Sequence, residues 1–582
     1  MQKISLKDKS QILIAILFVI LIQQKSFSQI ERETRAVWIA VNHHLDWPPQ
    51  TNDAEKQKKA LEEIFNNIKA KNLNTVYLQA RFNGTVLFKS YFEPFTSYVA
   101  EKTNGEISYD PLEYAVELAH KKGLEIHAWV NCVNVFSGSE TNILDNPNHI
   151  VKRKPEWIIE DNRDGTKSYW LDPGLPEVRA YIADVITEMV KNYDVDGVQL
   201  DYIRYPGKNF DDDFSYGVYG NDISRDDWRR NNITELIGLI NKNIKAVKPS
   251  VKLGAAPIGI YKNLNGTYAW EGFSQVYQDS REWLKQGVLD YVTPQIYWGM
   301  DESPRFDLIA KDWVENSYGR NVVLGIGAYK ENVKNEIGKM IQYSRSINAS
   351  GVAFFRYSNI KDYDFKNFSN RTFPADMTWL DGSSPEAPLN LRYERDEFNL
   401  SNKQVGIRLI KLVWNNKDTH YSNNIRYFAL YSLPHPGSEL LPDYLFDLVP
   451  ADKSSATLAI KPKKINYYFT MKSVGKLWKE SAEPSNVVDV KFDELNSLVN
   501  IDEQNQNPLL VKNTDGSTKI LLFSNIEDKI EVYGQDDLQQ KELLTEAISV
   551  GKNIIDLPVD ISKYKLLKII YQSSKREVEL KF

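Results

Sequence analysis

The sequence predicts an α/β fold: a (β/α)₈ TIM barrel followed by two small all-β sandwich domains. Residues 34–373 alternate short β-rich runs with helical stretches, and the runs number eight in about 340 residues, a length that suits a closed barrel. Beyond residue 389 the chain has alternating strands without a long helix. A doubly wound open sheet is the alternative, but no G-x-G-x-x-G motif follows the first strand and no phosphate-binding loop is present.

The barrel elements alternate along the chain. We expect strands at residues 35–42, 74–81, 124–131, 195–203, 251–258, 289–298, 321–329 and 351–357. Helices are expected between them, among others at residues 54–71, 111–122, 176–192, 225–248 and 332–348. Several of these helices open with Asp or Pro and close near Asn or Gly, as helix ends should.

Residues 1–28 are expected to be a signal peptide. Three lysines precede the apolar run at residues 12–22, and small serines lead to an expected cleavage after Ser28. The apolar run is too short to span a bilayer comfortably, although an uncleaved anchor is the alternative. No cysteine stands where a lipoprotein needs one. We therefore expect an exported protein (periplasmic, cell-surface or secreted) with no membrane span after signal cleavage.

The composition excludes several classes of protein. Hydrophobic residues make up 42% and charged residues 26%, ordinary values for globular domains. A formal net charge of −6 without a basic run argues against nucleic-acid binding. The single cysteine, Cys132, excludes an intramolecular disulfide and a Cys-rich zinc site. Aromatic residues reach 12%, which favours a carbohydrate partner because aromatic faces stack on sugars, although β-rich cores are also aromatic.

The residue pattern along the strands indicates which side chains face the barrel interior. Strand side chains alternate between two faces, and the face towards the helices must be apolar. The inward set is therefore Tyr77, Gln79, Arg81, His127, Trp129, Asn131, Gln199, Asp201, Thr293, Gln295 and Tyr297. Polarity is concentrated at the C-terminal ends of the strands, where barrel enzymes build their active sites. The pattern predicts a ligand pocket there, because buried polar groups cost free energy unless they are paired.

Asp201 is the strongest catalytic candidate. It ends the predicted fourth strand, where a carboxylate can act as a nucleophile, as an acid/base, or as electrostatic support for an oxocarbenium-like transition state. The structural alternative is an aspartate paired with Arg204 or Arg81.

Glycoside hydrolysis usually needs a second carboxylate. Asp46 follows the first predicted strand, Glu93 the second, and Asp301 and Glu302 the sixth. Spacing does not choose among them, and the predicted catalytic set is Asp201 with Glu93 and Asp46.

The substrate-binding set is drawn from the same strand ends. It consists of Trp38, Arg81, Trp129, Asn131, Arg204, Gln295, Tyr297 and Trp298. The aromatic members are stacking platforms for sugars or, equally, core residues. Arg81, Asn131 and Gln295 are expected to form hydrogen bonds with the substrate, and a glutamine amide can both donate and accept.

No metal or other cofactor is predicted. His43, His44 and Asp46 lie together after the first strand, but adjacent strand residues point to opposite faces and do not chelate naturally. The chain has no His-Glu-x-x-His motif and no Gly-x-Ser-x-Gly motif after a strand. A metal-dependent deacetylase or amidohydrolase remains the alternative in this class.

Several ordered motifs resemble the glycosyl hydrolase-like 10 family, also called the family 10 glycosylhydrolase-like or DUF187 group. They are residues 34–40 (TRAVWIA), 46–48 (DWP), 78–81 (LQAR), 127–131 (HAWVN), 171–174 (LDPG), 176–179 (PEVR), 196–206 (DGVQLDYIRYP), 257–259 (PIG) and 290–298 (DYVTPQIYW). The resemblance is collinear over about residues 33–360.

This resemblance implies a (β/α)₈ barrel, glycoside hydrolysis and a polysaccharide substrate. One branch of the family is associated with peptidoglycan glycan strands stripped of their stem peptides. The aspartate of the fourth-strand motif carries over to Asp201. Many members have a second aspartate directly after it, where this chain has Tyr202.

The predicted domains are a barrel at residues 29–375, a linker at 376–388 and a sandwich at 389–492 that resembles a fibronectin type III module. A second linker at 493–508 precedes a small β domain at 509–582. Such modules space enzymes or bind polysaccharide. The rival to a hydrolase is therefore a non-catalytic polysaccharide-binding or envelope-scaffold protein.

Overall fold

The computed structural model describes residues 32–581 except for a set of short segments. Those segments are residues 100–106, 140, 163–164, 221, 266, 381, 395–407, 416–424, 461–465, 492–507, 513–517, 525–527, 537–538, 549–550, 558–563 and 574. The predicted signal peptide, and with it the prediction of export, lies outside the described residues. No helix within the described part of the chain combines the length and the apolar character needed to cross a membrane.

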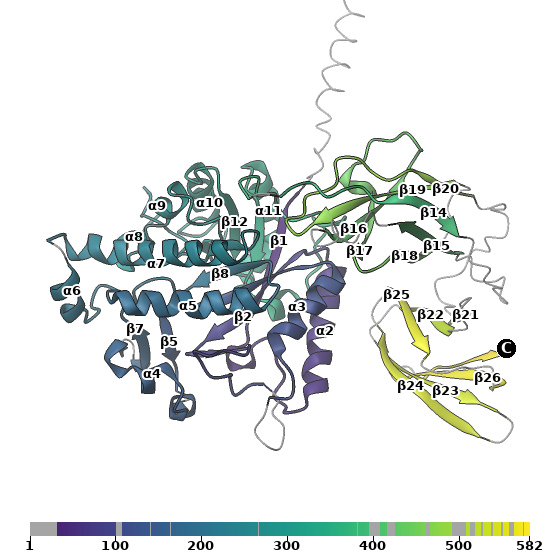
Figure 1. The fold of residues 1–582 in the computed structure, drawn as a ribbon, viewed down its shortest axis with the longest axis horizontal. Helices are drawn as coiled ribbons and strands as arrows, with labels where there is room; N and C mark the ends of the chain where they lie inside the picture. Colours follow the sequence, from purple (N-terminus) through teal and green to yellow (C-terminus); the bar gives the residue numbers. More distant parts are fainter. Residues whose placement is uncertain are drawn as a thin grey trace, which may run out of the picture.

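The first part of the chain is a closed barrel of eight parallel strands surrounded by helices (Figure 1). The strands are β1 (Thr34–Ile39), β2 (Thr75–Phe82), β4 (Glu125–Asn131), β8 (Gly197–Asp201), β9 (Lys252–Ala255), β10 (Tyr291–Val292), β12 (Asn321–Ile326) and β13 (Gly351–Phe354). Strand β1 pairs in parallel with both β2 and β13, which closes the sheet. The predicted fold class is confirmed.

Five of the longer barrel helices match the predicted ranges to within two residues at each end. The longer ones are α2 (Ala54–Ala70), α3 (Pro111–Lys122), α5 (Pro176–Asn192), α7 (Arg225–Val247), α10 (Phe306–Glu315) and α11 (Glu331–Ser346). Helix α3 shows the reason: the Asp110 side chain accepts a hydrogen bond from the Glu113 amide, and Pro111 occupies the first turn. Gly123 ends the helix in the left-handed conformation, with φ +73°, where a side chain is unfavourable.

The predicted alternation of side chains is observed along β2 as far as the register shift at residues 79–81. Val76, Leu78 and Ala80 of β2 belong to the core between strands and helices. Trp38 and Tyr77 belong to a second buried cluster inside the barrel, together with aromatic residues of other strands. Period-two alternation therefore separates two cores, one on each side of the sheet.

The N-terminal end of the barrel is closed by residues just beyond the last strand. The Ala375 amide donates to Thr34 Oγ1 (3.1 Å), and Trp379 Nε1 donates to Asp290 (2.8 Å). Met377 packs into the interior cluster. The predicted linker at residues 376–388 thus begins with side chains that form the floor of the barrel.

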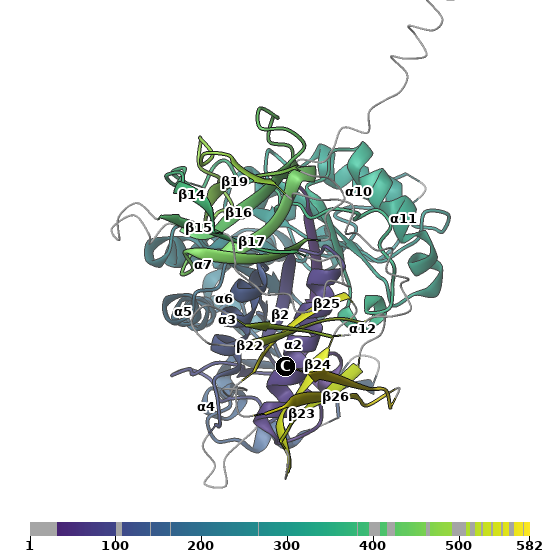
Figure 2. The same cartoon turned by 90° about the vertical axis from the view of Figure 1, so that its right-hand side faces the viewer.

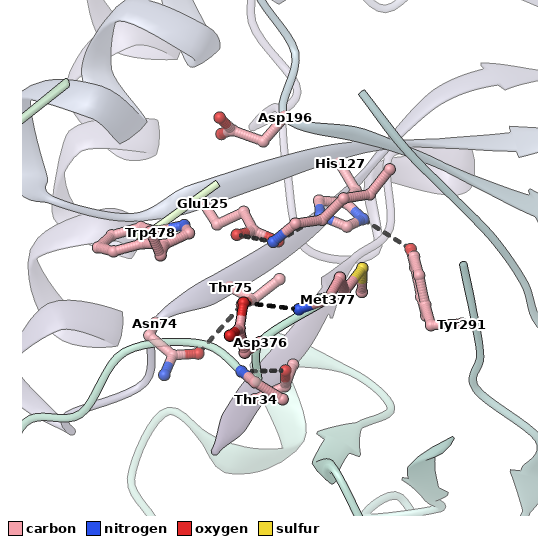
Figure 3. Close-up of polar contacts among 12 residues, drawn as sticks. Thr34, Asn74, Thr75, Glu125, His127, Asp196, Tyr291, Asp376, Met377 and Trp478 are labelled. Atoms are coloured by element: carbon pink, nitrogen blue, oxygen red, sulfur yellow. Dashed lines mark hydrogen bonds and ion pairs between the residues drawn. The ribbon is translucent and has the colours of Figure 1, made fainter. Parts of the chain in front are cut away.

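A buried polar network lies on this floor (Figure 3). Glu125 Oε2 pairs with Lys252 Nζ at 2.6 Å, and Glu125 Oε1 lies 2.6 Å from His127 Nε2. The other ring nitrogen of His127 lies 2.6 Å from the Tyr291 hydroxyl. Glu125 and Lys252 have only 3% of their side-chain surfaces exposed, so each charge relies on its partner.

Two antiparallel sandwiches follow the barrel (Figures 1 and 2). The first is built from β14 (Leu389–Glu394), β15 (Arg408–Asn415), β16 (Ile425–Leu433), β17 (Leu445–Pro450), β18 (Ser455–Ile460), β19 (Asn466–Gly475) and β20 (Val488–Lys491). The second is built from β21 (Leu509–Lys512), β22 (Thr518–Ser524), β23 (Asp528–Gln535), β24 (Gln540–Ile548), β25 (Gly551–Leu557), β26 (Leu566–Tyr571) and β27 (Glu577–Lys581). Each encloses its own apolar core, while the resemblance of the first to fibronectin type III stays a prediction.

The first sandwich packs against the N-terminal side of the barrel. Arg426 of β16 forms ion pairs with Asp194 (3.1 Å) and Asp196 (3.2 Å), which directly precede β8. The rings of Phe373 and Trp478 pack with centroids 5.5 Å apart. This contact lies at the opposite end of β8 from Asp201.

Candidate active site

Asp201 is the last residue of β8 and lies at the C-terminal end of the barrel. Trp129 Nε1 of β4 donates to Oδ2 at 3.0 Å. The Tyr202 amide (2.7 Å) and Gln295 Nε2 (3.2 Å) donate to Oδ1. Three N–H donors therefore hold the carboxylate, and 9% of the residue remains exposed.

The environment of Asp201 raises the pKa of its carboxyl above the ordinary value. Burial raises the pKa of the carboxyl, because a low-dielectric surrounding disfavours the charged form. The Tyr202 amide, Arg204, Trp129 and Gln295 each favour the charged form, but burial prevails and the pKa stays above its ordinary value.

Glu93 lies in a buried ion pair instead of at this carboxylate. Arg81 Nε donates to Oε2 (2.8 Å) and Arg81 Nη2 to Oε1 (2.5 Å), and the Tyr181 hydroxyl also donates to Oε1 (2.9 Å). The Glu93 side chain is fully buried and Arg81 is 1% exposed. A register shift between Gln79 and Arg81 explains why the simple alternation misplaces this arginine. The geometry favours a structural role for this ion pair, while the predicted catalytic role of Glu93 and the substrate-binding role of Arg81 stay predictions.

Replacing Glu93 by glutamine tests this assignment. The amide keeps a hydrogen-bonding shape but leaves the buried Arg81 charge without its counterion, so we expect a loss of about 3–5 kcal/mol of stability. The measurement is thermal unfolding alongside the pH profile of glycan cleavage. An unchanged unfolding temperature together with a lost limb of the pH profile would instead make Glu93 catalytic.

The Asp46 carboxylate also accepts hydrogen bonds from groups of the protein itself. Its Oδ2 accepts from the Ala40 amide (2.8 Å), and Oδ1 accepts from the Ser358 amide (2.8 Å) and from Arg356 (2.7 Å). The side chain is fully buried. These contacts fasten the loop after β1 to the segment after β13 and favour a structural role, while the catalytic role of Asp46 stays a prediction.

The two further carboxylates considered lie after β11 (Gln295–Ile296). Glu302 accepts from the Gly299 amide and from Asn332 Nδ2 (3.1 Å). Asp301 is exposed on the same loop. Neither forms a contact with Asp201 within the described residues.

The predicted aromatic platforms divide into two groups. Trp38 (1% exposed) and Trp129 (4% exposed) are buried in the barrel interior, which favours the core alternative for both, while sugar stacking by them stays a prediction. Trp129 instead positions Asp201 through its indole N–H. Tyr297 and Trp298 are half-buried at the C-terminal end. Burial, with the negative charge of Asp201 nearby, raises the pKa of Tyr297 well above its ordinary value and keeps its hydroxyl neutral.

The remaining predicted binding residues lie next to Asp201. Gln295 donates both to Asp201 and to the Ala256 carbonyl (3.0 Å). Asn131 pairs with Asp201 in the β4–β8 ladder, and its buried Oδ1 accepts no hydrogen bond from any described residue. A buried acceptor of this kind is satisfied by water or by a substrate hydroxyl. The guanidinium of Arg204 lies 5.0 Å from the Tyr202 ring centroid and 5.2 Å from that of Trp170.

The histidines after β1 do not form a metal centre. His44 Nδ1 donates to the Pro48 carbonyl (2.7 Å), and its ring packs against Tyr98 with centroids 4.2 Å apart. Across the described residues, no group of three or more His, Cys, Asp or Glu side chains is placed to hold a metal ion.

The family model described as glycosyl hydrolase-like 10 matches residues 33–345, which is more than half of the chain and includes Asp201. The chain belongs to the glycosyl hydrolase-like 10 family. The resemblance predicted from the motifs is confirmed, and membership implies a carbohydrate substrate.

Relatives in this family carry hydrolase names. The chain is 32% identical over 334 residues to a protein named glycosyl hydrolase DigH of Escherichia coli strain K12, covering 53% of this chain and 76% of that one. It is 31% identical over 418 residues to glycosyl hydrolase YngK of Bacillus subtilis strain 168, covering 65% and 80% respectively. Among solved structures, the PgaB glycoside hydrolase domain of Bordetella bronchiseptica aligns at 13% identity with a TM-score of 0.42, over 57% of this chain and 96% of that one.

Other aromatic residues lie in loops at the C-terminal end of the barrel and were not predicted as site residues. The Phe355 ring stacks on Tyr297 with centroids 5.5 Å apart, and Tyr329, 51% exposed, packs edge-on to both. Trp270 lies on the loop after β9 and is 46% exposed. Their position in loops after barrel strands was the available signal, because that is where barrel enzymes place substrate contacts.

Proposed function

We propose that the protein is an exported glycoside hydrolase that cleaves O-glycosidic bonds of a polysaccharide, with Asp201 as its catalytic carboxylate. The observation that carries this proposal is the Asp201 environment: a strand-end carboxyl, held by three N–H donors and with a raised pKa, in a glycosyl hydrolase-like family. Peptidoglycan glycan strands without stem peptides are the proposed substrate, and the charged and apolar pattern of residues 1–28 supports export to where such strands occur.

The hydrogen bonds of Asp201 select its reactive oxygen. Oδ1 accepts from both Tyr202 and Gln295, whereas Oδ2 accepts only from Trp129 among the described residues. Each carboxylate oxygen has two lone-pair sites, so Oδ2 retains one. The raised pKa favours a proton on this oxygen, which would pass to the glycosidic oxygen as the bond between that oxygen and the anomeric carbon breaks.

In this proposal the substrate itself supplies the nucleophile that a second carboxylate provides in other glycosidases. Glu93 and Asp46 are both committed to arginine partners. In substrate-assisted glycosidases an acylamino group of the sugar attacks the anomeric carbon, and water then opens the intermediate. The sugars of peptidoglycan strands carry such a group. N-acetylated glycans are therefore expected to be cleaved in preference to matched glycans without it.

Product release decides the proposal. The purified protein is incubated with peptidoglycan with and without its peptides, and with plant and algal glycans, and soluble products are identified by mass spectrometry. We expect release from peptide-free strands. Release from none of the glycans would overturn the hydrolase.

Because Glu93 and Asp46 are each paired with an arginine, a second candidate function is favoured, that of a non-catalytic polysaccharide-binding protein. Such a protein would retain peptide-free strands in a sedimentation assay without shortening them. Binding without any new reducing ends is the result that distinguishes it from the hydrolase.

Replacing Trp129 by phenylalanine is expected to shift the pH dependence of cleavage. The change removes one N–H donor that favours ionised Asp201, so the pKa of Asp201 rises further. A hydrogen bond to a charged group is worth about 1.5–3 kcal/mol, so the limb of the kcat/KM profile that reports Asp201 should move up by about 1–2 pH units. Trp283→Phe is the matched control, because its indole donates to Thr234 on the barrel exterior. A limb that moves equally in both variants would refute the positioning role.

A further inference from the structure

The loop between β9 and α8 (Gly272–Gln275) presents two aromatic side chains to solvent. Tyr268 is 75% exposed and Trp270 is 46% exposed. Large aromatic rings lose favourable burial when they are left in water, so neighbouring exposed rings on one loop point to a binding surface. Since β9 is a parallel barrel strand, the loop that follows it lies at the same end of the barrel as Asp201.

The loop is held by its own hydrogen bonds. Glu271 Oε2 accepts from the Asn263 amide (2.7 Å) and from Asn263 Nδ2 (2.8 Å). Asn263 Oδ1 in turn accepts from the Ala269 amide at 2.8 Å, directly between the two aromatic residues. The bonds fix the segment that carries the rings before any ligand arrives, which lowers the ordering cost of binding.

Short chains of contacts connect Trp270 to the catalytic carboxylate. The Arg204 guanidinium lies 5.1 Å from the Trp270 ring centroid and 5.0 Å from that of Tyr202. The backbone amide of Tyr202 donates to Asp201. At the start of the same loop Ile258 pairs with Gln295, the other side chain that donates to Asp201 Oδ1.

The charge of Arg204 fixes the indole without burying it. A guanidinium over an aromatic face is attracted by the ring quadrupole, and this interaction helps to hold the Trp270 indole against Arg204. Nearly half of Trp270 nonetheless stays exposed. A positioned, half-exposed indole of this kind offers a flat apolar surface to the C–H face of a sugar ring.

We propose that Trp270, with Tyr268 further out on the loop, forms a sugar-stacking subsite next to the cleavage position. The subsite takes a pyranose ring of the polysaccharide beyond the two sugars that flank the scissile bond. The protein therefore acts on chains in preference to disaccharides. This inference rests on the proposed function and adds the position of the bound chain, which runs from Asp201 across the loop after β9.

Binding to an inactive form tests the subsite independently of catalysis. In an Asp201→Asn background, titration calorimetry compares a long peptide-free peptidoglycan strand with the disaccharide from the same polymer. We expect Trp270→Ala to weaken binding of the long strand about tenfold, a loss of about 1.4 kcal/mol, and to leave the disaccharide unaffected. Trp270→Phe, which keeps a flat ring, should restore most of the affinity.

Tyr91→Ala is the matched control, because Tyr91 is 93% exposed and lies beside Glu188 of α5, away from the loop. It should leave both affinities unchanged. Equal binding of the long strand with and without Trp270, an equal loss in the Tyr91 variant, or no binding of any strand would each overturn the subsite. Trp270-dependent binding in a protein that releases no product would keep the subsite and refute the hydrolase.

Discussion

Replacing Asp201 by asparagine is expected to lower the rate of glycan cleavage by at least about 10²–10⁴-fold, the range that general acid–base catalysis contributes. Asparagine has nearly the same shape but no proton to transfer at the Oδ2 position, so binding should survive while chemistry stops. Rates of release of reducing ends from peptide-free strands provide the measurement, with affinity for the same strands measured in parallel.

The folded state should tolerate this change. Burial raises the pKa of Asp201, which means that the ionised carboxylate opposes folding at neutral pH and a neutral amide does not. The unfolding temperature is therefore expected to stay close to that of the wild type. Asp213→Asn, which removes a mostly exposed carboxylate at the start of α6 (Asp213–Tyr219), is the matched control and should keep full activity. Wild-type rates in the Asp201 variant would refute its catalytic role.

The barrel could be predicted from sequence because its determinants are local. Strand alternation and helix caps involve residues two to four positions apart, as Asp110 and Glu113 at the start of α3 show. The predicted range of that helix, residues 111–122, is the observed one. The same period-two pattern predicts the strands of the two sandwiches, but it does not predict which strands pair with each other.

The site could be predicted only in part, because its geometry depends on pairings between strands. Asp201 ends its strand as predicted, but the strand register shifts before Arg81, whose guanidinium pairs with Glu93. Asp46 is bound by Arg356, a residue 310 positions away. No spacing rule within one segment reveals such a partner.

Aromatic residues show the same limit. Trp38 lies in β1 and is 1% exposed, whereas Trp270 lies in the loop after β9 and is 46% exposed. Alternation places Trp38 inside the barrel but does not tell how deep it lies along the strand. Trp379 shows the same limit. It lies in a segment whose turn formers predict a linker, yet its indole donates to Asp290 and closes the barrel floor.

Replacing Lys252 by methionine is expected to destabilise the barrel by about 3–5 kcal/mol at neutral pH. The change leaves Glu125 with an uncompensated charge on the barrel floor, where 3% of its side chain is exposed. Chemical or thermal unfolding followed by the barrel's own tryptophan fluorescence measures the loss. Lys122→Met, which removes a pair with the half-exposed Glu62, is the matched control and should cost about 0–1 kcal/mol.

The pH dependence of that loss identifies its cause. Burial raises the pKa of Glu125, but Lys252 and His127 lower it further and the result lies below the ordinary value. In the wild type the network therefore stabilises fully above the unfolded pKa of about 4.3, and this stabilisation is lost as the pH falls through the folded pKa. Without Lys252 the burial of Glu125 favours its protonated form. Protonation at low pH removes the unpaired charge, so the variant loses less stability there. The difference between the two proteins should be largest at neutral pH and shrink towards pH 4.

A double variant separates the charge from the packing. Glu125→Gln combined with Lys252→Met removes both charges and keeps an amide within reach of His127, whose second nitrogen remains beside Tyr291. Replacing both members of a buried pair costs much less than removing one, so the double variant should recover most of the lost stability and its pH dependence. If the double variant were as unstable as Lys252→Met at every pH, the loss would come from the packing of the lysine stem and not from the unpaired carboxylate.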